Sequence, residues 1–200
     1  MKLYILRHED RTQDATFFAP LTKTGLDNSV KLIAKCNELH INHIYSSPYI
    51  RTLQTIYPYA KAKGVNIKID YSISEINDSN IIPKNSHGIT LPEYLAKGFL
   101  YDESYKSTIQ PEEIKYPETF KEVNFRAKNF LKNVITNHHK TDDRVLVVTH
   151  QIVCDAILSV VNRKLSIECY PVGAISQVFE DDHWIFKPTN WRPKSPLTNA

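Results

Sequence analysis

The chain has 200 residues, of which 42% are hydrophobic and 24% are charged, values close to those of soluble globular proteins and far from those of disordered segments. Its formal charge of +3 comes from 25 basic residues scattered among 22 acidic ones, so the composition favours an anionic ligand only weakly. Three cysteines without a C-x-x-C pair argue against a disulfide framework or a zinc knuckle, and no apolar stretch approaches the ~20 residues of a membrane helix.

The four-residue apolar run before Arg7 is too short for a signal peptide. We therefore expect a single cytoplasmic domain over residues 1–200, with no membrane partner and an undetermined oligomeric state.

Short apolar runs alternate with amphipathic patterns in the first half of the chain, which predicts an α/β fold. Residues 2–6 predict a strand, and Thr22 predicts the N-cap of a helix. Residues 43–45 predict a second strand, and the following Ser-Ser-Pro run predicts a helix start. Pro58 should kink that second helix or end it early. The stripe expected to be buried on the first helix consists of Leu26, Val30 and Ile33.

The second half continues the alternation. Residues 65–73 predict a strand, with Gly64 ending the helix before it. Apolar spacing predicts a long helix over residues 120–134, a buried parallel strand over 145–148 and a helix over 152–161. A terminal hairpin is expected from alternations at 174–179 and 184–186, joined across Asp181 and Asp182.

Two segments stand apart from this alternation. Residues 76–116 hold three prolines and little periodicity, so they are either a lid that determines substrate specificity or a surface loop with a short helix near 92–97. The side chains that would line such a lid are Tyr94, Lys97, Tyr101, Tyr105 and Lys106. Residues 190–200 are expected to form a C-terminal tail.

Polar residues follow each predicted strand at its carboxyl end, which is where ligands bind in open parallel sheets. These residues are Arg7 and His8, then Ser47 and Arg51, then Glu75, and finally His150. Guanidinium groups bind phosphate oxygens in forked pairs and stay charged at every relevant pH, so the set predicts a phosphate site. Taken singly, each residue is more often structural than functional. The other six histidines have no comparable context and are expected to be structural or surface residues: His40, His43, His87, His138, His139 and His183.

The same residues resemble the motifs of a known family. Leu6-Arg7-His8-Glu9-Asp10, the run Ile44-Tyr45-Ser46-Ser47-Pro48 with Arg51, Glu75, and Val147-Val148-Thr149-His150 are similar, in this order, to the histidine phosphatase superfamily, its phosphoglycerate mutase-like group. The resemblance extends over residues 3–160. It implies a three-layer α/β/α sandwich with a mostly parallel central sheet, His8 as phosphoryl acceptor, and Arg7, Arg51 and His150 as phosphate ligands. Glu75 would handle the leaving-group proton.

The chain also departs from the family pattern. Glu9 stands where glycine is usual, Gln151 follows the second histidine where glycine is usual, and Thr52 occupies a position where alanine is usual. After Glu75 the chain reads Ile-Asn-Asp, whereas mutase-like members often continue with glycine, tryptophan and an acid. Hydrolysis is therefore favoured over mutase activity. Arg11 and Gln151 are added as candidate substrate-binding residues.

We accordingly expect a metal-independent phosphomonoester hydrolase, similar to histidine acid phosphatases, with no cofactor and with a small phosphorylated metabolite or a phosphoprotein as substrate. Three alternatives stay open: mutase-type phosphoryl transfer, a non-catalytic phospho-ligand or protein-binding module, and a metallohydrolase built on His8, Asp10, Glu75 and His150. Against the metallohydrolase, Arg7 would repel a dication and the chain has no H-E-x-x-H motif. No compact basic run or glycine-rich phosphate loop indicates nucleic-acid or nucleotide binding.

Overall fold

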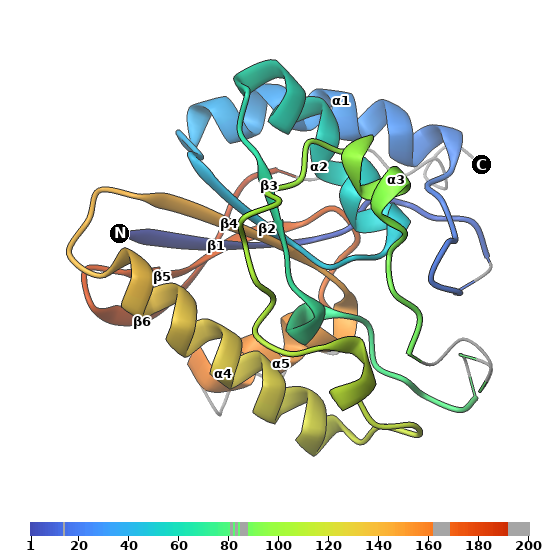
Figure 1. The fold of residues 1–200 in the computed structure, drawn as a ribbon. Coiled ribbons are helices and arrows are strands. Elements are labelled where there is room, and N and C mark those ends of the chain that lie inside the picture. Colours follow the sequence, from blue (N-terminus) through green and yellow to red (C-terminus); the bar gives the residue numbers. More distant parts are fainter. Residues whose placement is uncertain (14, 81, 83, 85–87, 162–168, 192–200) are drawn as a thin grey trace.

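A computed structural model describes residues 1–13, 15–80, 82, 84, 88–161 and 169–191. A six-stranded sheet in the order β3-β2-β4-β1-β5-β6 forms its middle layer, with α1 and α2 on one face and α4 and α5 on the other (Figure 1). The predicted three-layer α/β sandwich is therefore confirmed. The elements are β1 (Lys2–Arg7), α1 (Lys23–Glu38), β2 (His43–Ser46), α2 (Ile50–Lys63), β3 (Ile67–Ile69), the 3₁₀ turn η1 (Tyr71–Ile73), α3 (Glu93–Lys97), η3 (Pro111–Glu113), α4 (Phe120–His138), β4 (Arg144–Thr149), α5 (Gln151–Val161), β5 (Ile175–Glu180) and β6 (His183–Pro188).

The sheet is mostly parallel. β4 pairs in parallel with both β1 and β2, and β2 pairs in parallel with β3. β5 runs antiparallel to β1, and β6 runs antiparallel to β5. The turn between β5 and β6 consists of Asp181 and Asp182, which both have positive φ, as in the type I′ turns of two-residue hairpins. In the parallel part Arg7 lies opposite Thr149 and Ser46 lies opposite Val148. Strands β1, β2 and β4 thus end at one edge of the sheet.

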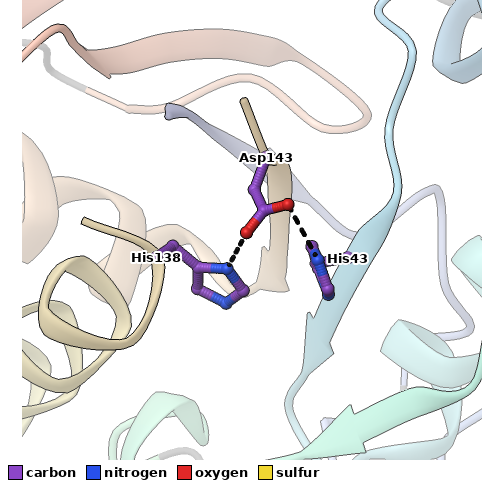
Figure 2. A group of neighbouring side chains, drawn as sticks. All are labelled: His43, His138 and Asp143. Carbon is purple, nitrogen blue, oxygen red and sulfur yellow. Dashed lines mark hydrogen bonds and ion pairs between the residues drawn. The ribbon is translucent and has the colours of Figure 1, made fainter. Parts of the chain in front are cut away.

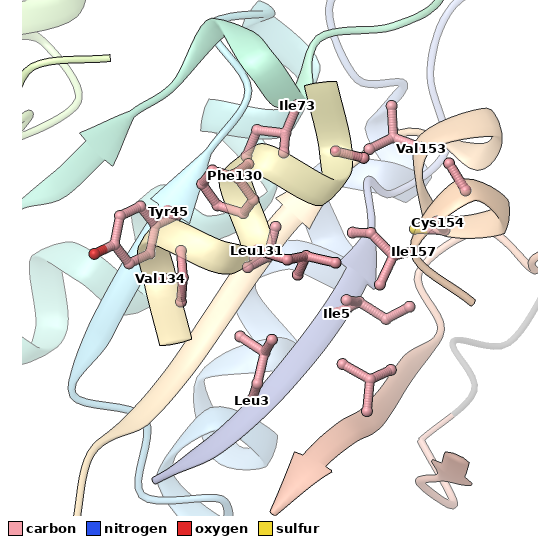
Figure 3. Packing of buried hydrophobic residues seen from close by; sticks show 14 of the residues in the cluster. Leu3, Ile5, Tyr45, Ile73, Phe130, Leu131, Val134, Val153, Cys154 and Ile157 are labelled. Atoms are coloured by element: carbon pink, nitrogen blue, oxygen red, sulfur yellow. The ribbon is translucent and has the colours of Figure 1, made fainter. Parts of the chain in front are cut away.

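Apolar side chains fill both interfaces between the sheet and the helices. On the α4/α5 face, Leu3 and Ile5 of β1 pack with Phe130 of α4 and Ile157 of α5 (Figure 3). The alternate residues of the same strands pack under α1 and α2. Each central strand is therefore buried on both sides, which explains its continuous apolar sequence. In the described part of the chain, no helix is both long and apolar enough to cross a membrane.

The expected buried stripe of α1 was wrong. Leu26 and Val30 are 43% and 57% exposed, and Ile33 is only half-buried. The residues that face inward are Gly25, Asn28, Ser29, Leu32 and Cys36. The N-terminal half of this face packs against the polar loop after β1 instead of against an apolar core, so small and polar residues occupy it.

Two boundaries also differ from the sequence expectation. β3 is only three residues long, because Asp70 turns the chain into η1 by accepting hydrogen bonds from Ser72 N (2.8 Å), the Tyr105 hydroxyl (2.6 Å) and Thr108 N (2.9 Å). Helix α2 continues past Pro58 to Lys63 and ends, as predicted, at Gly64 with φ 67°. The helix predicted near residues 92–97 is α3, and most of the expected C-terminal tail lies outside the described residues.

Candidate active site

His8 follows β1 and is almost completely buried, with 2% exposure. Its Nδ1 lies 2.7 Å from the backbone carbonyl oxygen of Glu9. Because a carbonyl only accepts hydrogen bonds, Nδ1 carries the ring proton and Nε2 keeps its lone pair. The backbone of the loop is fixed as well, since His8 N donates to Thr149 O (2.9 Å) and Glu9 N donates to Thr55 Oγ1 (3.0 Å). A single imidazole nitrogen is thereby available as a nucleophile.

The first turn of α1 holds the same loop from the other side. Thr22 N donates to Asp10 O (2.9 Å), and Thr22 Oγ1 donates to Asp10 Oδ2 (2.7 Å). Gly25 allows this approach, because a Cβ atom at that position would lie 2.1 Å from Asp10 O. Helix α1 therefore begins in direct contact with the backbone that carries His8.

His150 follows β4, is fully buried, and faces His8 with the ring centroids 5.3 Å apart and the ring planes at 63°. Its Nε2 lies 2.8 Å from Ser47 Oγ, just after β2. Its Nδ1 lies 3.6 Å from Glu75 Oε2. His8, Ser47 and His150 thus lie close together because β1, β2 and β4, the adjacent parallel strands that they follow, end at the same edge of the sheet.

Arg51 lies in the first turn of α2 and is fully buried. Its Nη2 lies 3.9 Å from Glu75 Oε2, and its Nη1 donates to Thr16 O (2.9 Å). Its guanidinium carbon stacks 4.5 Å from the centroid of the Tyr49 ring, which in turn lies 4.7 Å from the His150 ring. A cation in a first helical turn faces the positive end of the helix dipole, so the nearby carboxylate, or a bound anion, stabilises it.

Glu75 is held through its backbone by Arg126 of α4. Arg126 Nη1 donates to Ser72 O and Ser74 O (2.8 Å each), and Nη2 donates to Glu75 O (3.3 Å). Arg126 also forms a bidentate ion pair with Glu118: Nε donates to Oε1 (2.7 Å) and Nη2 donates to Oε2 (2.9 Å). The Glu75 carboxylate itself is 17% exposed and opens toward the site. Its position thus depends on a buried arginine from a different layer of the fold.

The remaining predicted residues lie around this centre. Arg7 donates from Nη1 to Tyr170 O (2.6 Å), and its charge acts on both His8 and Glu75. Arg11 donates to Thr12 O (2.7 Å), and its charge also acts on His8. Gln151 is the half-buried first residue of α5. The structure therefore brings together Arg7, His8, Arg51, Glu75 and His150, with Arg11 and Gln151 at their margin.

Burial and charge set the protonation states of these groups. Burial, followed by the positive charge of Arg51, lowers the pKa of His8 and that of His150 well below the usual 6.5. Burial raises the pKa of Glu75 above 4.5, although Arg51 opposes the shift. At neutral pH both imidazoles are therefore uncharged, and the carboxyl group keeps its proton to higher pH than an exposed glutamate does.

The glutamate at the position where glycine was expected packs against α1. The side chain of Glu9 is fully buried there, and Asn28 Nδ2 donates to its Oε2 (3.4 Å). Burial raises its pKa to about 7. The Glu9 carboxyl group is thus engaged by helix α1.

Sequence reasoning missed two residues of the site. Tyr49 contacts both Arg51 and His150, and its position between Pro48 and Arg51 in the motif run was an available signal. Arg126 lies in the middle of a long amphipathic helix, at a position where the sequence pattern does not distinguish a buried arginine from one at the helix surface. No local pattern distinguishes it.

A comparison with models of protein families matches the histidine phosphatase superfamily (branch 1) over residues 4–171. The chain belongs to this superfamily. A curated relative, the probable phosphoglycerate mutase GpmB of Escherichia fergusonii, is 28% identical over 99 residues, which cover 46% of each chain. The match thus spans about half the length of that relative.

Solved structures share the fold over nearly the whole chain. The ecdysone phosphate phosphatase of Bombix mori, solved in complex with tungstate, gives a TM-score of 0.73 at 16% identity and covers 100% of this chain and 95% of that one. A mycobacterial glucosyl-3-phosphoglycerate phosphatase, in complex with VO3, gives a TM-score of 0.68 at 14% identity over 94% of this chain and 98% of that one. At these identities the likeness establishes the shared architecture alone.

Proposed function

We propose that the protein hydrolyses phosphomonoesters through a covalent phosphohistidine on His8. The observation that carries the proposal is the state of this residue: a buried, uncharged imidazole whose Nδ1 is tied to a carbonyl, beside two arginines and a second imidazole. In the first step Nε2 attacks phosphorus in line with the ester oxygen. The Nε2–phosphorus bond forms, the phosphorus–oxygen ester bond breaks, and Glu75 gives its proton to the departing alkoxide.

In the second step Glu75, now ionised, accepts a proton from a water molecule as that water attacks phosphorus. The phosphorus–nitrogen bond breaks, inorganic phosphate leaves, and Glu75 and His8 return to their starting states. One carboxyl group acts as acid and then as base, which suits a pKa raised by burial.

The guanidinium groups of Arg7 and Arg51 and the Nδ1–H of His150 would stabilise the negative charge on the transferring phosphoryl group. These groups supply the positive charge that a divalent ion would otherwise provide, so we propose a metal-independent reaction. Activity that survives exhaustive chelation would support this assignment, and activity restored only by added metal would contradict it.

We propose a small phosphorylated molecule or a phosphoprotein as the substrate, with selectivity residing in residues 76–116. This segment contributes Asn77, Ile89 and Ile114 to a pocket that it shares with Phe17 and Tyr49, and Tyr49 touches Arg51. The two phosphatases named above, which act on phosphorylated small molecules, favour the first class. The free thiols Cys36, Cys154 and Cys169 support a cytoplasmic setting.

Phosphoglycerate mutase-type transfer is a second candidate, favoured by the 28% identity to the probable mutase. Transfer and hydrolysis share the first step and differ in whether water or a second hydroxyl accepts the phosphoryl group. Product analysis with a panel of phosphorylated metabolites distinguishes the two, since only hydrolysis releases inorganic phosphate stoichiometrically.

Rapid-quench labelling with a phosphorylated substrate tests the proposal. Wild-type protein in excess chelator should form an acid-labile, base-stable phosphoryl adduct that turns over at the rate of the reaction. His8→Ala should form no adduct, whereas His183→Ala, at an exposed position, should behave as wild type. Multiple turnover without any adduct would contradict the covalent scheme.

A further inference from the structure

A second group of polar side chains lies at the opposite edge of the sheet. His43 is the first residue of β2, His138 is the last residue of α4, and Asp143 directly precedes β4. The Asp143 carboxylate lies between the two imidazoles, with Oδ2 2.7 Å from His138 Nδ1 and Oδ1 3.2 Å from His43 Nε2 (Figure 2). The ligand atoms of all three residues lie within 4.8 Å of one another. Neither histidine has a functional context in the sequence, because 95 positions separate them in the chain.

We propose that His43, His138 and Asp143 bind a divalent transition-metal ion of the zinc class. Two imidazole nitrogens and one carboxylate oxygen are a donor set typical of zinc sites that keep a fourth position for water. Zinc bonds of about 2.0–2.1 Å place tetrahedral ligand atoms roughly 3.3 Å apart. The separations of 2.7 and 3.2 Å from the two carboxylate oxygens, and the 4.8 Å within which all three ligand atoms lie, bracket this spacing.

Tyr45 provides the outer partner that a ligating histidine needs. Its hydroxyl lies 3.0 Å from His138 Nε2, the nitrogen that points away from Asp143. On metal binding the ring proton moves from Nδ1 to Nε2, Nδ1 gives its lone pair to the ion, and the Tyr45 oxygen accepts the Nε2–H bond. Such outer hydrogen bonds fix the tautomer and orientation of a ligand ring.

Hydrogen bonds hold the turn that carries two of the three ligands. Lys2 N donates to Asp143 O (2.8 Å), Asp143 N donates to Thr141 Oγ1 (3.2 Å), and Thr141 Oγ1 donates to His138 O (2.7 Å). An ion can reach the group, because the side chains of His43 and Asp143 are 33% and 22% exposed while His138 forms the inner wall at 5%. Lys68 of β3 is one cation near the group; its ammonium lies 5.1 Å from the Tyr45 ring centroid, and its charge also acts on Asp102. The N-terminal ammonium of Met1 is another, since it donates to Thr141 O (2.6 Å) in the turn before Asp143.

The ion would be structural and independent of the proposed phosphatase chemistry. His43 begins β2 and Ser47 directly follows it, so the metal and phosphate sites are separated by about 13 Å along the strand. An ion here would join the end of α4 to the start of β2 and to the turn before β4, two strands that already pair in the sheet.

Calorimetric titration of chelator-treated, full-length protein with Zn²⁺ at pH 7.5 tests the proposal. Wild type should bind one equivalent and melt at higher temperature in Zn²⁺ than in chelator. His43→Gln and Asp143→Asn should weaken binding at least tenfold, since each keeps a hydrogen-bonding side chain but removes a strong ligand. His139→Ala, at the exposed neighbouring position, and His8→Ala, in the phosphate site, should bind as wild type does. No binding by wild type, or unchanged affinity in His43→Gln, would overturn the proposal.

Two spectroscopic measurements distinguish metal binding at this site from binding to the three thiols or to the histidines of the phosphate site. Co²⁺ at the proposed site should give visible absorption without the near-ultraviolet charge-transfer band of a thiolate ligand. In wild-type protein Zn²⁺ should shift the imidazole C–H NMR signals of His43 and His138 and leave that of His183 in place. A thiolate band, or shifts confined to His8 and His150, would assign the ion elsewhere and overturn the proposal.

Discussion

The hydroxyl group of Ser47 lies 2.8 Å from Nε2 of His150. Ser47 Oγ accepts a hydrogen bond from Tyr49 N (3.4 Å) and has one hydrogen of its own, which it can donate to Nε2. The proton of His150 then resides on Nδ1, which faces Glu75. A residue outside the expected catalytic set therefore orients a hydrogen-bond donor toward the proposed phosphate site.

Removal of this hydroxyl should impair catalysis without unfolding the protein. In Ser47→Ala the His150 ring is free to adopt the other tautomer and to rotate, and we expect kcat to fall about 10²-fold with a smaller change in KM. Steady-state kinetics on a phosphomonoester measure the effect. Ser46→Ala is the matched control, because the Ser46 hydroxyl donates to the backbone oxygen of Ser47 (2.9 Å) and not to a catalytic side chain. Equal losses in both variants would mean that catalysis does not depend on the hydrogen bond between Ser47 and His150.

The pH dependence of hydrolysis should follow the two shifted groups. The active form has His8 unprotonated, and since its pKa is lowered, activity should persist at pH values well below 6.5. The active form also has Glu75 protonated, and since its pKa is raised above 4.5, activity on alkyl phosphates should decline only as pH rises through that higher value. Profiles of kcat/KM against pH check both limbs.

Glu75→Gln tests the proton transfer directly. It should lower kcat/KM, which reports the phosphoryl transfer to His8, by about 10²- to 10⁴-fold on alkyl phosphates and much less on activated aryl phosphates, because only a poor leaving group needs the proton. The declining alkaline limb should vanish from the profile of the variant. Equal losses on both substrate types would remove Glu75 from the role of acid.

Arg126→Met should lower both stability and turnover. The substitution leaves the Glu118 carboxylate buried without its partner and frees the backbone carbonyls around Glu75, so we expect a loss of about 3 kcal/mol in the free energy of unfolding. Urea denaturation measures this value, and Lys128→Met, an exposed site on the same helix, controls for loss of charge. Adding Glu118→Gln should recover part of the stability but not the turnover, because Glu75 stays unanchored.

Glu9 should make the protein less stable as the solution becomes less acidic. Its pKa rises from 4.5 to about 7 on folding, chiefly through burial, with Asp10 adding to the shift and Asn28 and Lys31 opposing it. The folded state therefore retains a proton that the unfolded state loses, and stability contributed below pH 4.5 is lost as pH rises toward 7, by up to about 3 kcal/mol. Among the described residues Glu9 Oε1 has no hydrogen-bond partner, so nothing compensates that oxygen for burial when the carboxyl group ionises.

Glu9→Gln should remove that dependence. Between pH 5 and pH 7.5 the free energy of unfolding, measured by urea denaturation, should fall less in Glu9→Gln than in wild type, whereas the matched exposed variant Glu38→Gln should fall as wild type does. An unchanged pH slope in Glu9→Gln would mean that another group is responsible.

The parts of the fold that depend on local pattern could be read from the sequence. The order of strands and the motif after each one placed Arg7, His8, Arg51, Glu75 and His150 at one edge, because parallel strands end together. The face of α1 could not be read, since its partner is the polar loop around Glu9 and Asp10 and not an apolar core. The short length of β3 likewise depends on Asp70, whose partners Tyr105 and Thr108 come from a distant segment.

Position 25 illustrates how a residue without functional groups acquires the mutational profile of an active-site residue. In a saturation library scored for phosphatase turnover, every substitution of Gly25 should be depleted, because any side chain would displace the Asp10 carbonyl and with it the nucleophile two residues earlier. Gly64, which has open space but a φ of 67°, should instead tolerate replacement at a modest cost in stability. Depletion at position 25 therefore reports the packing of a helix against a catalytic loop, and a search for chemistry there would be misdirected.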